Sequence, residues 1–290
     1  MKIAALAFSL LYCCTSLAIT GGKTVSPSDP IAKHLAYLEM YGANGQPYNC
    51  TSVIIAKNML LTAAHCAKFY APWRMWAAFT TQVQKYNQNW ASAEYKKGNL
   101  IPVKTYAVNK AYVVYESPSY NFKTETTKQY DKIADQYFAN YVRHAADLAV
   151  VVLTKNIPPG FQPVPIYQGQ ISDNTILTIS GYGLNSVQDY LGGAGNTFTL
   201  RKVRMKINQI SKNTFGSNGV SQTDSVCSGD SGGAAFIRQN GKLYLVGTTI
   251  LGSCGKNREQ NIFEHDKTFK NWILNQAPAQ AQKFLAKITS

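Results

Sequence analysis

The chain has 290 residues, with 29 Lys and Arg against 15 Asp and Glu, a formal net charge of +14 and six cysteines. This length exceeds the needs of one small core and is ordinary for a pair of six-stranded β-barrels. The charge favours attraction to anionic surfaces. No nucleic-acid-binding motif accompanies it, so we expect no specific nucleic-acid partner.

The first eighteen residues are typical of a secretory signal peptide. A basic start precedes an apolar stretch over residues 3–12, and a small-x-small cleavage site follows at 16–18. The apolar stretch is too short to anchor the chain across a bilayer. Cleavage after Ala18 would remove Cys13 and Cys14 and leave Ile19 as the first residue. We therefore expect a secreted protein, extracellular or in transit through a periplasm.

The rest of the chain is patterned as short strands. Runs rich in β-branched residues recur, for example at 52–55, 175–179 and 243–247, and clusters of Gly, Asn and Pro separate them. This pattern predicts antiparallel β structure. The sequence Ile157-Pro158-Pro159-Gly160 marks the expected crossing between two halves.

Three short strings carry residues suited to catalysis. In chain order they are Thr62-Ala63-Ala64-His65-Cys66, Asp147-Leu148 before the apolar run 149–153, and Gly229-Asp230-Ser231-Gly232-Gly233. Taken singly, each has an ordinary explanation: a turn serine, a packed or metal-binding histidine, and an aspartate at a strand end. Together they resemble the His, Asp and Ser boxes of the trypsin/chymotrypsin-like serine peptidases, and they occur in that family's order.

The resemblance implies a role for each residue. Ser231 would be the nucleophile and His65 the general base that takes its proton, because a serine hydroxyl is a weak nucleophile on its own. Asp147 would hold the imidazole in the right tautomer. The amides of Gly229 and Ser231 would form the oxyanion hole, where losing one donor typically costs roughly 100- to 1,000-fold in rate. Neither a cofactor nor a metal is expected.

Four cysteines remain after the leader, at Cys50, Cys66, Cys227 and Cys254, and they allow three pairings. The family resemblance selects Cys50–Cys66, behind the histidine, and Cys227–Cys254, near the serine. A zinc site is the alternative, but the chain has no Cys-x-x-Cys spacing. Disulfides would agree with an oxidising compartment.

The sequence Ile19-Thr20-Gly21-Gly22 resembles the Ile-Val-Gly-Gly start of activated family members. In them the freed isoleucine amine pairs with the aspartate before the catalytic serine, which is Asp230 here. Two routes to this terminus are open. Either signal peptidase creates it directly, which we favour, or Leu17-Ala18 forms a stub that is removed later.

The resemblance also implies an all-β fold of two packed six-stranded antiparallel β-barrels, at about 30–155 and about 160–265. A C-terminal helix at about 266–275, containing Trp272-Ile273, and a tail at 276–290 would follow. Gly181-Tyr182-Gly183 resembles the Gly-Trp-Gly of the second barrel's core strand. The segment 126–144 is an insertion relative to compact relatives, with apolar residues at helical spacing. It would overhang the substrate site, either restricting access or docking a partner, or it would be a solvated helical flap.

The resemblance places Ser225 at the base of the primary specificity pocket, with Leu251, Gly252 and Asn261 as its walls. An uncharged base predicts a preference for a non-basic residue before the cut. Asp224 is one position away, and strand alternation would point it elsewhere. Expected partners are protein or peptide substrates, protein inhibitors and anionic surfaces, and the chain is expected to be a monomer.

A second class of function stays open. Chymotrypsin-fold proteins also occur as cationic binding proteins without proteolytic activity, and this chain is cationic. Those proteins have typically lost the histidine or the serine, whereas His65, Asp147 and Ser231 are all present here.

Overall fold

The computed structural model describes residues 19–68, 70–84, 88–112, 146–184, 197–211, 214–252, 254, 261–265 and 272. The predicted signal peptide (1–18), insertion (126–144) and tail (276–290) lie outside the described residues. The predicted C-terminal helix does too, apart from Trp272. No helix in the described ranges is long and apolar enough to cross a membrane.

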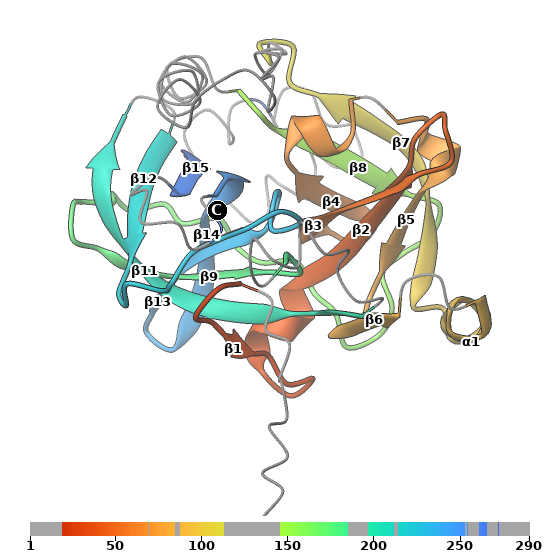
Figure 1. The fold of residues 1–290 in the computed structure, drawn as a ribbon, viewed down its shortest axis with the longest axis horizontal. Helices are drawn as coiled ribbons and strands as arrows, with labels where there is room; N and C mark the ends of the chain where they lie inside the picture. The colour runs from red at the N-terminus through yellow and green to blue at the C-terminus, as the bar shows by residue number, and fades with distance from the viewer. Residues whose placement is uncertain are drawn as a thin grey trace, which may run out of the picture.

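The first half of the chain forms a closed, antiparallel six-stranded barrel, drawn mainly in red to green at the right of Figure 1. The strands follow one another around the barrel in the order β2-β3-β4-β8-β7-β5. Their bounds are β2 (Leu35–Tyr41), β3 (Pro47–Ala56), β4 (Met59–Thr62), β5 (Met75–Ala78), β7 (Leu100–Val108) and β8 (Ala149–Leu153).

The second half forms a seven-stranded antiparallel sheet with the order β1-β11-β12-β15-β14-β13-β9. Strand β9 also pairs with β11, so the sheet curls back on itself. The bounds are β1 (Lys23–Thr24), β9 (Ile176–Gly181), β11 (Arg201–Ile210), β12 (Thr214–Gly219), β13 (Ala234–Gln239), β14 (Lys242–Leu251) and β15 (Asn261–His265).

The expected pair of six-stranded barrels is therefore only partly correct. The mostly-β class and one closed six-stranded barrel are confirmed, whereas the second half is a seven-stranded sheet. The additional strand is β1, which comes from the start of the described chain and pairs Lys23 with Lys202 on β11. A strand of two exposed polar residues carries no hydrophobic alternation, so the sequence gives no signal for it.

The described chain also contains a few shorter elements. Strands β6 (Gln82–Gln84) and β10 (Thr197–Thr199) pair with each other as a two-stranded ribbon. Helix α1 (Gln88–Lys97) is followed by Gly98, which takes a positive φ of 80°. The described ranges also contain three 3₁₀ helices: η1 (Pro30–His34), η2 (Ala64–Cys66) and η3 (Pro72–Arg74).

Side-chain alternation divides the buried residues into an inner and an outer set. On β3, Ile54 points into the barrel core beside Leu60, while Val53 and Ile55 point out of it. The outward set packs with residues of the second half, such as Phe236 and Leu245, and builds the seam between the two units. Because successive residues of a strand face opposite sides, a strand such as β3 contributes side chains both to the barrel core and to the seam between the two units. The second half keeps a core of its own around Ile179, Met205 and Phe215.

Candidate active site

His65 lies at the end of a buried strand of the first barrel. All four residues of β4 are buried, and η2 follows directly, so the backbone turns at the barrel rim. This turn leaves the imidazole with 32% of its side chain exposed, while the carboxylate of Asp147 is fully buried. The imidazole is therefore open to solvent on one side and held by a buried protein group on the other.

Asp147 is held beside this histidine by strand pairing. It comes two residues before β8, whose Ala149 pairs with Thr62 on β4. Its Oδ2 lies 2.7 Å from His65 Nδ1, and its Oδ1 accepts a hydrogen bond from the His65 backbone amide at 2.9 Å. Burial disfavours the imidazolium. The charge of Asp147 and its hydrogen bond outweigh burial, so the pKa of His65 is raised above its usual value.

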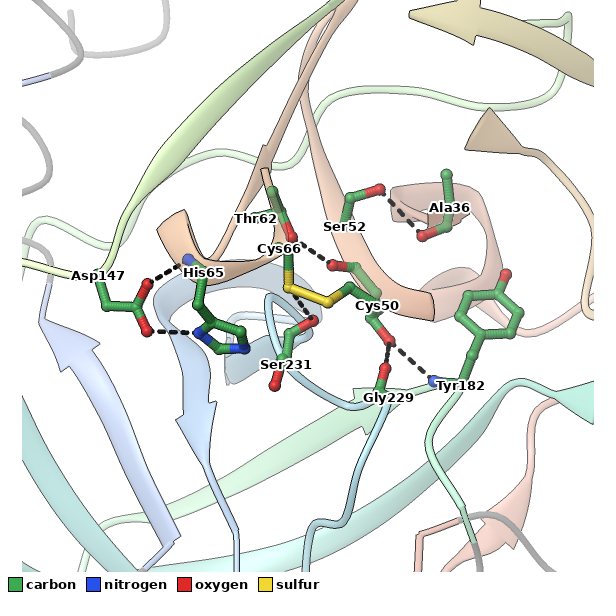
Figure 2. Close-up of a disulfide and its surroundings, with 11 residues drawn as sticks. Ala36, Cys50, Ser52, Thr62, His65, Cys66, Asp147, Tyr182, Gly229 and Ser231 are labelled. Carbon is green, nitrogen blue, oxygen red and sulfur yellow. Dashed lines mark hydrogen bonds and ion pairs between the residues drawn. A yellow bond between two sulfur atoms is a disulfide. The ribbon is translucent and has the colours of Figure 1, made fainter. Parts of the chain in front are cut away.

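Ser231 comes from the other half of the molecule, on the loop before β13. Its carbonyl oxygen accepts a hydrogen bond of 2.9 Å from the amide of Thr51 on β3, which ties the loop to the first barrel. Figure 2 shows the imidazole of His65 between Asp147 and Ser231. Within the described chain, no hydrogen bond joins the Ser231 hydroxyl to the imidazole. Such bonds are often long in a site without substrate.

The loop before Ser231 has a backbone that only glycine readily adopts. Gly229 has a φ of 92°, and a Cβ there would lie 2.5 Å from Nδ2 of Asn49 and 3.0 Å from Cα of Gly183. The carbonyl of Ser228 accepts a hydrogen bond of 2.7 Å from the amide of Leu184. Because the peptide is planar and trans, this bond directs the Gly229 N–H to the opposite side.

The buried side chain of Asp230 anchors the same loop through two backbone amides. Its Oδ1 accepts from the amide of Gly183 at 2.7 Å and its Oδ2 from the amide of Cys227 at 2.8 Å. Burial raises the pKa of Asp230 to about 7, and the two amides and the charge of Arg201 oppose that rise only in part. No cation of the described chain lies within ion-pair distance of this carboxylate.

Ile19 is completely buried in the core of the second half. Its φ of 49° is unusual for a β-branched residue. The next residue, Thr20, forms a bridge with Ser225, so the chain start runs past the predicted pocket base. The expected ion pair between the Ile19 amine and Asp230 stays a prediction, because the amine is within the peptide chain here.

Two disulfides join the cysteine pairs that the family resemblance implied. Cys50–Cys66 links β3 to η2 and appears in Figure 2, and Cys227–Cys254 links the serine loop to the end of β14. Ligand atoms of Cys50, Cys66 and His65 lie within 4.8 Å of one another. Both sulfurs are bonded in the disulfide, so they offer no thiolate to a metal.

The predicted pocket residues lie on neighbouring segments. Ser225 is 3% exposed, and a Cβ on Gly252 would collide with the carbonyl of Val226, so these two segments pack tightly. Leu251 ends β14, and Asn261 begins β15, although the Asn261 side chain lies outside the description. Asp224 accepts a hydrogen bond of 2.9 Å from the amide of Ser221 within its own turn.

Sequence reasoning missed one residue of this site. Thr51 is fully buried, and its hydroxyl donates to the carbonyl of Gly229 at 2.9 Å and accepts from the amide of Tyr182 at 2.9 Å. In the sequence it stands out only as the last residue of the glycosylation sequon Asn49-Cys50-Thr51. Since Nδ2 of Asn49 is buried, this sequon is inaccessible in the folded chain.

The structure thus brings a buried carboxylate, an imidazole and a serine together at the seam of two β units, with a glycine-rich turn beside the serine. This arrangement defines the class of the chymotrypsin-like serine hydrolases. Comparison with known proteins agrees: the family model described as Trypsin matches residues 103–273, more than half of the chain. The chain therefore belongs to the trypsin family, whose members are typically serine endopeptidases.

Individual relatives match over most of the chain. It is 29% identical over 236 residues to a trypsin of Phaedon cochleariae, which covers 77% of either sequence. It is also 26% identical over 247 residues to chymotrypsin-like elastase family member 1 of Homo sapiens, covering 81% of this chain and 84% of that protein. The stretch matched by the family model includes Asp147 and Ser231, while His65 precedes it.

Proposed function

We propose that this chain is a secreted serine endopeptidase that works through an acyl-enzyme intermediate. The single observation that carries the proposal is the His65–Asp147 pair, with its 2.7 Å contact between Nδ1 and a buried carboxylate. That contact leaves Nε2 of the imidazole free of its proton, so this atom can act as a base. On the neighbouring loop, Ser231 is the serine to which the family resemblance assigns the role of nucleophile.

In the proposed reaction, Ser231 Oγ attacks the scissile carbonyl carbon and its proton passes to Nε2 of His65. Asp147 stabilises the imidazolium, which the raised pKa of His65 supports. Nε2 then protonates the leaving amine, and the acyl group stays on Ser231. A water molecule, deprotonated by the same nitrogen, releases the acid and restores the hydroxyl.

The negative charge that forms on the carbonyl oxygen would be bound by the amides of Gly229 and Ser231. Support comes from the backbone: Gly229 has a positive φ, and the Ser228 carbonyl, held by Leu184, leaves the Gly229 N–H on the opposite side of the peptide. Donors fixed before the reaction need no reorganisation during it, which is why such sites contribute strongly to the rate.

We further propose a preference for a non-basic residue before the cut, with Ser225 at the pocket base and Leu251, Gly252 and Asn261 around it. The hydrogen bond that Asp224 accepts from Ser221 supports this preference, because it holds Asp224, the sequence neighbour of Ser225, within its own turn. A lysine or arginine buried without a counter-charge would face a heavy desolvation penalty.

The predicted export signal and the two disulfides support release to an oxidising compartment, and we propose that the mature chain begins at Ile19. The Ile19 amine would then supply Asp230 with a cation. N-terminal sequencing of the secreted, active protein tests this: a start well upstream of Ile19, or past Gly22, excludes the ion pair.

A fluorophosphonate probe tests the activity itself. The wild-type chain should be labelled at Ser231 and should hydrolyse peptides, and Ser231→Ala should lose the label and several orders of magnitude of turnover. Ser221→Ala, which removes an exposed hydroxyl, should keep both. Near-normal hydrolysis by Ser231→Ala refutes the assignment of the nucleophile. A folded wild-type chain that neither reacts nor hydrolyses supports the non-catalytic binding protein instead.

A further inference from the structure

Thr51 connects three backbone segments that meet at the serine loop. It lies on β3 of the first barrel and is fully buried. Its amide donates to the carbonyl of Ser231 at 2.9 Å, and its hydroxyl donates to the carbonyl of Gly229 at 2.9 Å. The same hydroxyl accepts from the amide of Tyr182, at 2.9 Å. Figure 2 labels three of the residues whose backbone takes part in these bonds or lies beside them, Gly229, Tyr182 and Ser231.

These bonds act on the peptides next to the two oxyanion donors. The Gly229 carbonyl belongs to the peptide between the one that carries the Gly229 N–H and the one that carries the Ser231 N–H. The Ser231 carbonyl belongs to the peptide that follows both. Thr51 therefore fixes the loop at two points, one between the donors and one after them. Because each peptide is planar, these contacts restrict the direction of both N–H groups.

The bond to Tyr182 extends the same control to a second loop. Tyr182 is followed by Gly183, whose amide holds Asp230 at 2.7 Å, and by Leu184, whose amide holds the Ser228 carbonyl at 2.7 Å. Those two contacts anchor the serine loop from its other side. A single hydroxyl, used as donor and acceptor at once, thus sets the spacing between the loop that carries the oxyanion donors and the loop that supports them.

We propose that Thr51 is a positioning residue for the oxyanion hole: its hydroxyl aligns the 182–184 loop with the 229–231 loop so that the amides of Gly229 and Ser231 converge on one oxygen. The inference rests on the proposed function. Thr51 should therefore affect transition-state stabilisation and leave the base unchanged. The hydrogen bonds described for the Thr51 hydroxyl go to Gly229 and Tyr182, and none goes to His65 or Asp147.

The test compares three variants with the wild type. Thr51→Val keeps the shape and removes the hydroxyl, so kcat should fall roughly 10- to 100-fold, less than or near the loss of one oxyanion donor. KM should stay within about threefold, since the interaction is made only in the transition state. Thr51→Ser retains the hydroxyl and should restore kcat to within about threefold. The pH midpoint for His65 should be unchanged.

Ser52→Ala is the matched control for buried hydroxyls. Ser52 is the next residue on β3, is equally buried, and donates to the carbonyl of Ala36 at 3.0 Å, away from the serine loop. It should lower the denaturation midpoint in urea, as Thr51→Val does, and yet keep kcat. If Thr51→Val does not fold, Thr51→Ala against Thr51→Ser gives the same comparison.

The outcomes separate this inference from the proposed function. An active wild type with an equally active, folded Thr51→Val overturns only the inference. Equal losses of kcat in Thr51→Val and Ser52→Ala also overturn it, because the effect would then follow stability. A shift in the pH midpoint would show that Thr51 acts through the base. A wild-type chain without any activity overturns the proposed function and the inference with it.

Discussion

Replacing Asp147 by asparagine should stop catalysis through the tautomer of His65. The geometry decides which way the new amide must face. One oxygen of Asp147 accepts from the His65 backbone N–H at 2.9 Å, and the other lies 2.7 Å from Nδ1. A backbone N–H is always a donor, so the asparagine oxygen has to stay with it. The NH₂ group is then turned towards Nδ1.

An NH₂ group facing Nδ1 makes this nitrogen an acceptor, and the proton of the neutral imidazole moves to Nε2. That is the atom which has to accept the proton of Ser231, so the base is lost although every contact distance is kept. A wrong tautomer of this kind costs about 10,000-fold in kcat, or about 5.4 kcal/mol of activation free energy. The pKa of His65 should fall as well, because the charge that raises it is gone.

The assay is kcat on a peptide amide substrate for the wild type, Asp147→Asn and the control Asp29→Asn. Asp29 is a partly exposed carboxylate that also accepts from a backbone amide, that of Ile31 at 3.0 Å. Its replacement should leave kcat unchanged. An Asp147→Asn chain that folds, shown by an unchanged denaturation midpoint, and keeps kcat within tenfold of the wild type would refute the argument from the forced amide orientation.

Three further expectations follow from the proposed site. Cleavage of a peptide library should occur after non-basic residues, and efficient cleavage after Lys or Arg would show that an acid reaches the pocket that Ser225 closes. In an uncut chain made inactive by Ser231→Ala, Asp230 titrates near 7 instead of 3.8. The folded state then keeps a proton that the unfolded state loses, so the contribution of Asp230 to thermal stability is greatest below about pH 4 and declines towards pH 7. Adding Asp230→Asn should flatten that decline. Removing both Cys50 and Cys66 as serines should lower the unfolding free energy by about 3 kcal/mol in urea titrations, from the sequence separation of 16; a loss below 1 kcal/mol would contradict the loop-entropy estimate.

The residues of the site that could be predicted from the sequence are those that lie in short local motifs. His65 and Asp147 each lie next to a buried strand in the sequence. Each motif therefore predicts both the functional residue and the strand that positions it. The apolar run after Asp147-Leu148 forms strand β8 (Ala149–Leu153). The tight turn before Ser231 follows from its glycines, and Gly229 has the positive φ that such a turn requires.

The residues that sequence reasoning missed depend on contacts between distant segments. Thr51 acquires its place only when β3 meets loops about 130 and 180 positions later, as the separations of 131 and 178 residues show. Helix α1 is a different case, because its local composition contained a signal. The sequence Gln88–Lys97 has strong helix formers, and Gly98 follows as a C-terminal cap with a positive φ.

Because the site is divided between two β units, its activity depends on how these units are aligned. The base and its carboxylate move with the closed barrel, and the nucleophile moves with the seven-stranded sheet. A shift of about 1 Å between reacting groups can cost about 100-fold in rate. A small rotation of one β unit relative to the other would therefore abolish catalysis while every strand stays intact. The turnover number should therefore decrease at a lower urea concentration than the circular dichroism signal does. A substitution at Val53, Ile55 or Phe236 that loosens the packing between the units should lower kcat before it lowers the stability of the fold.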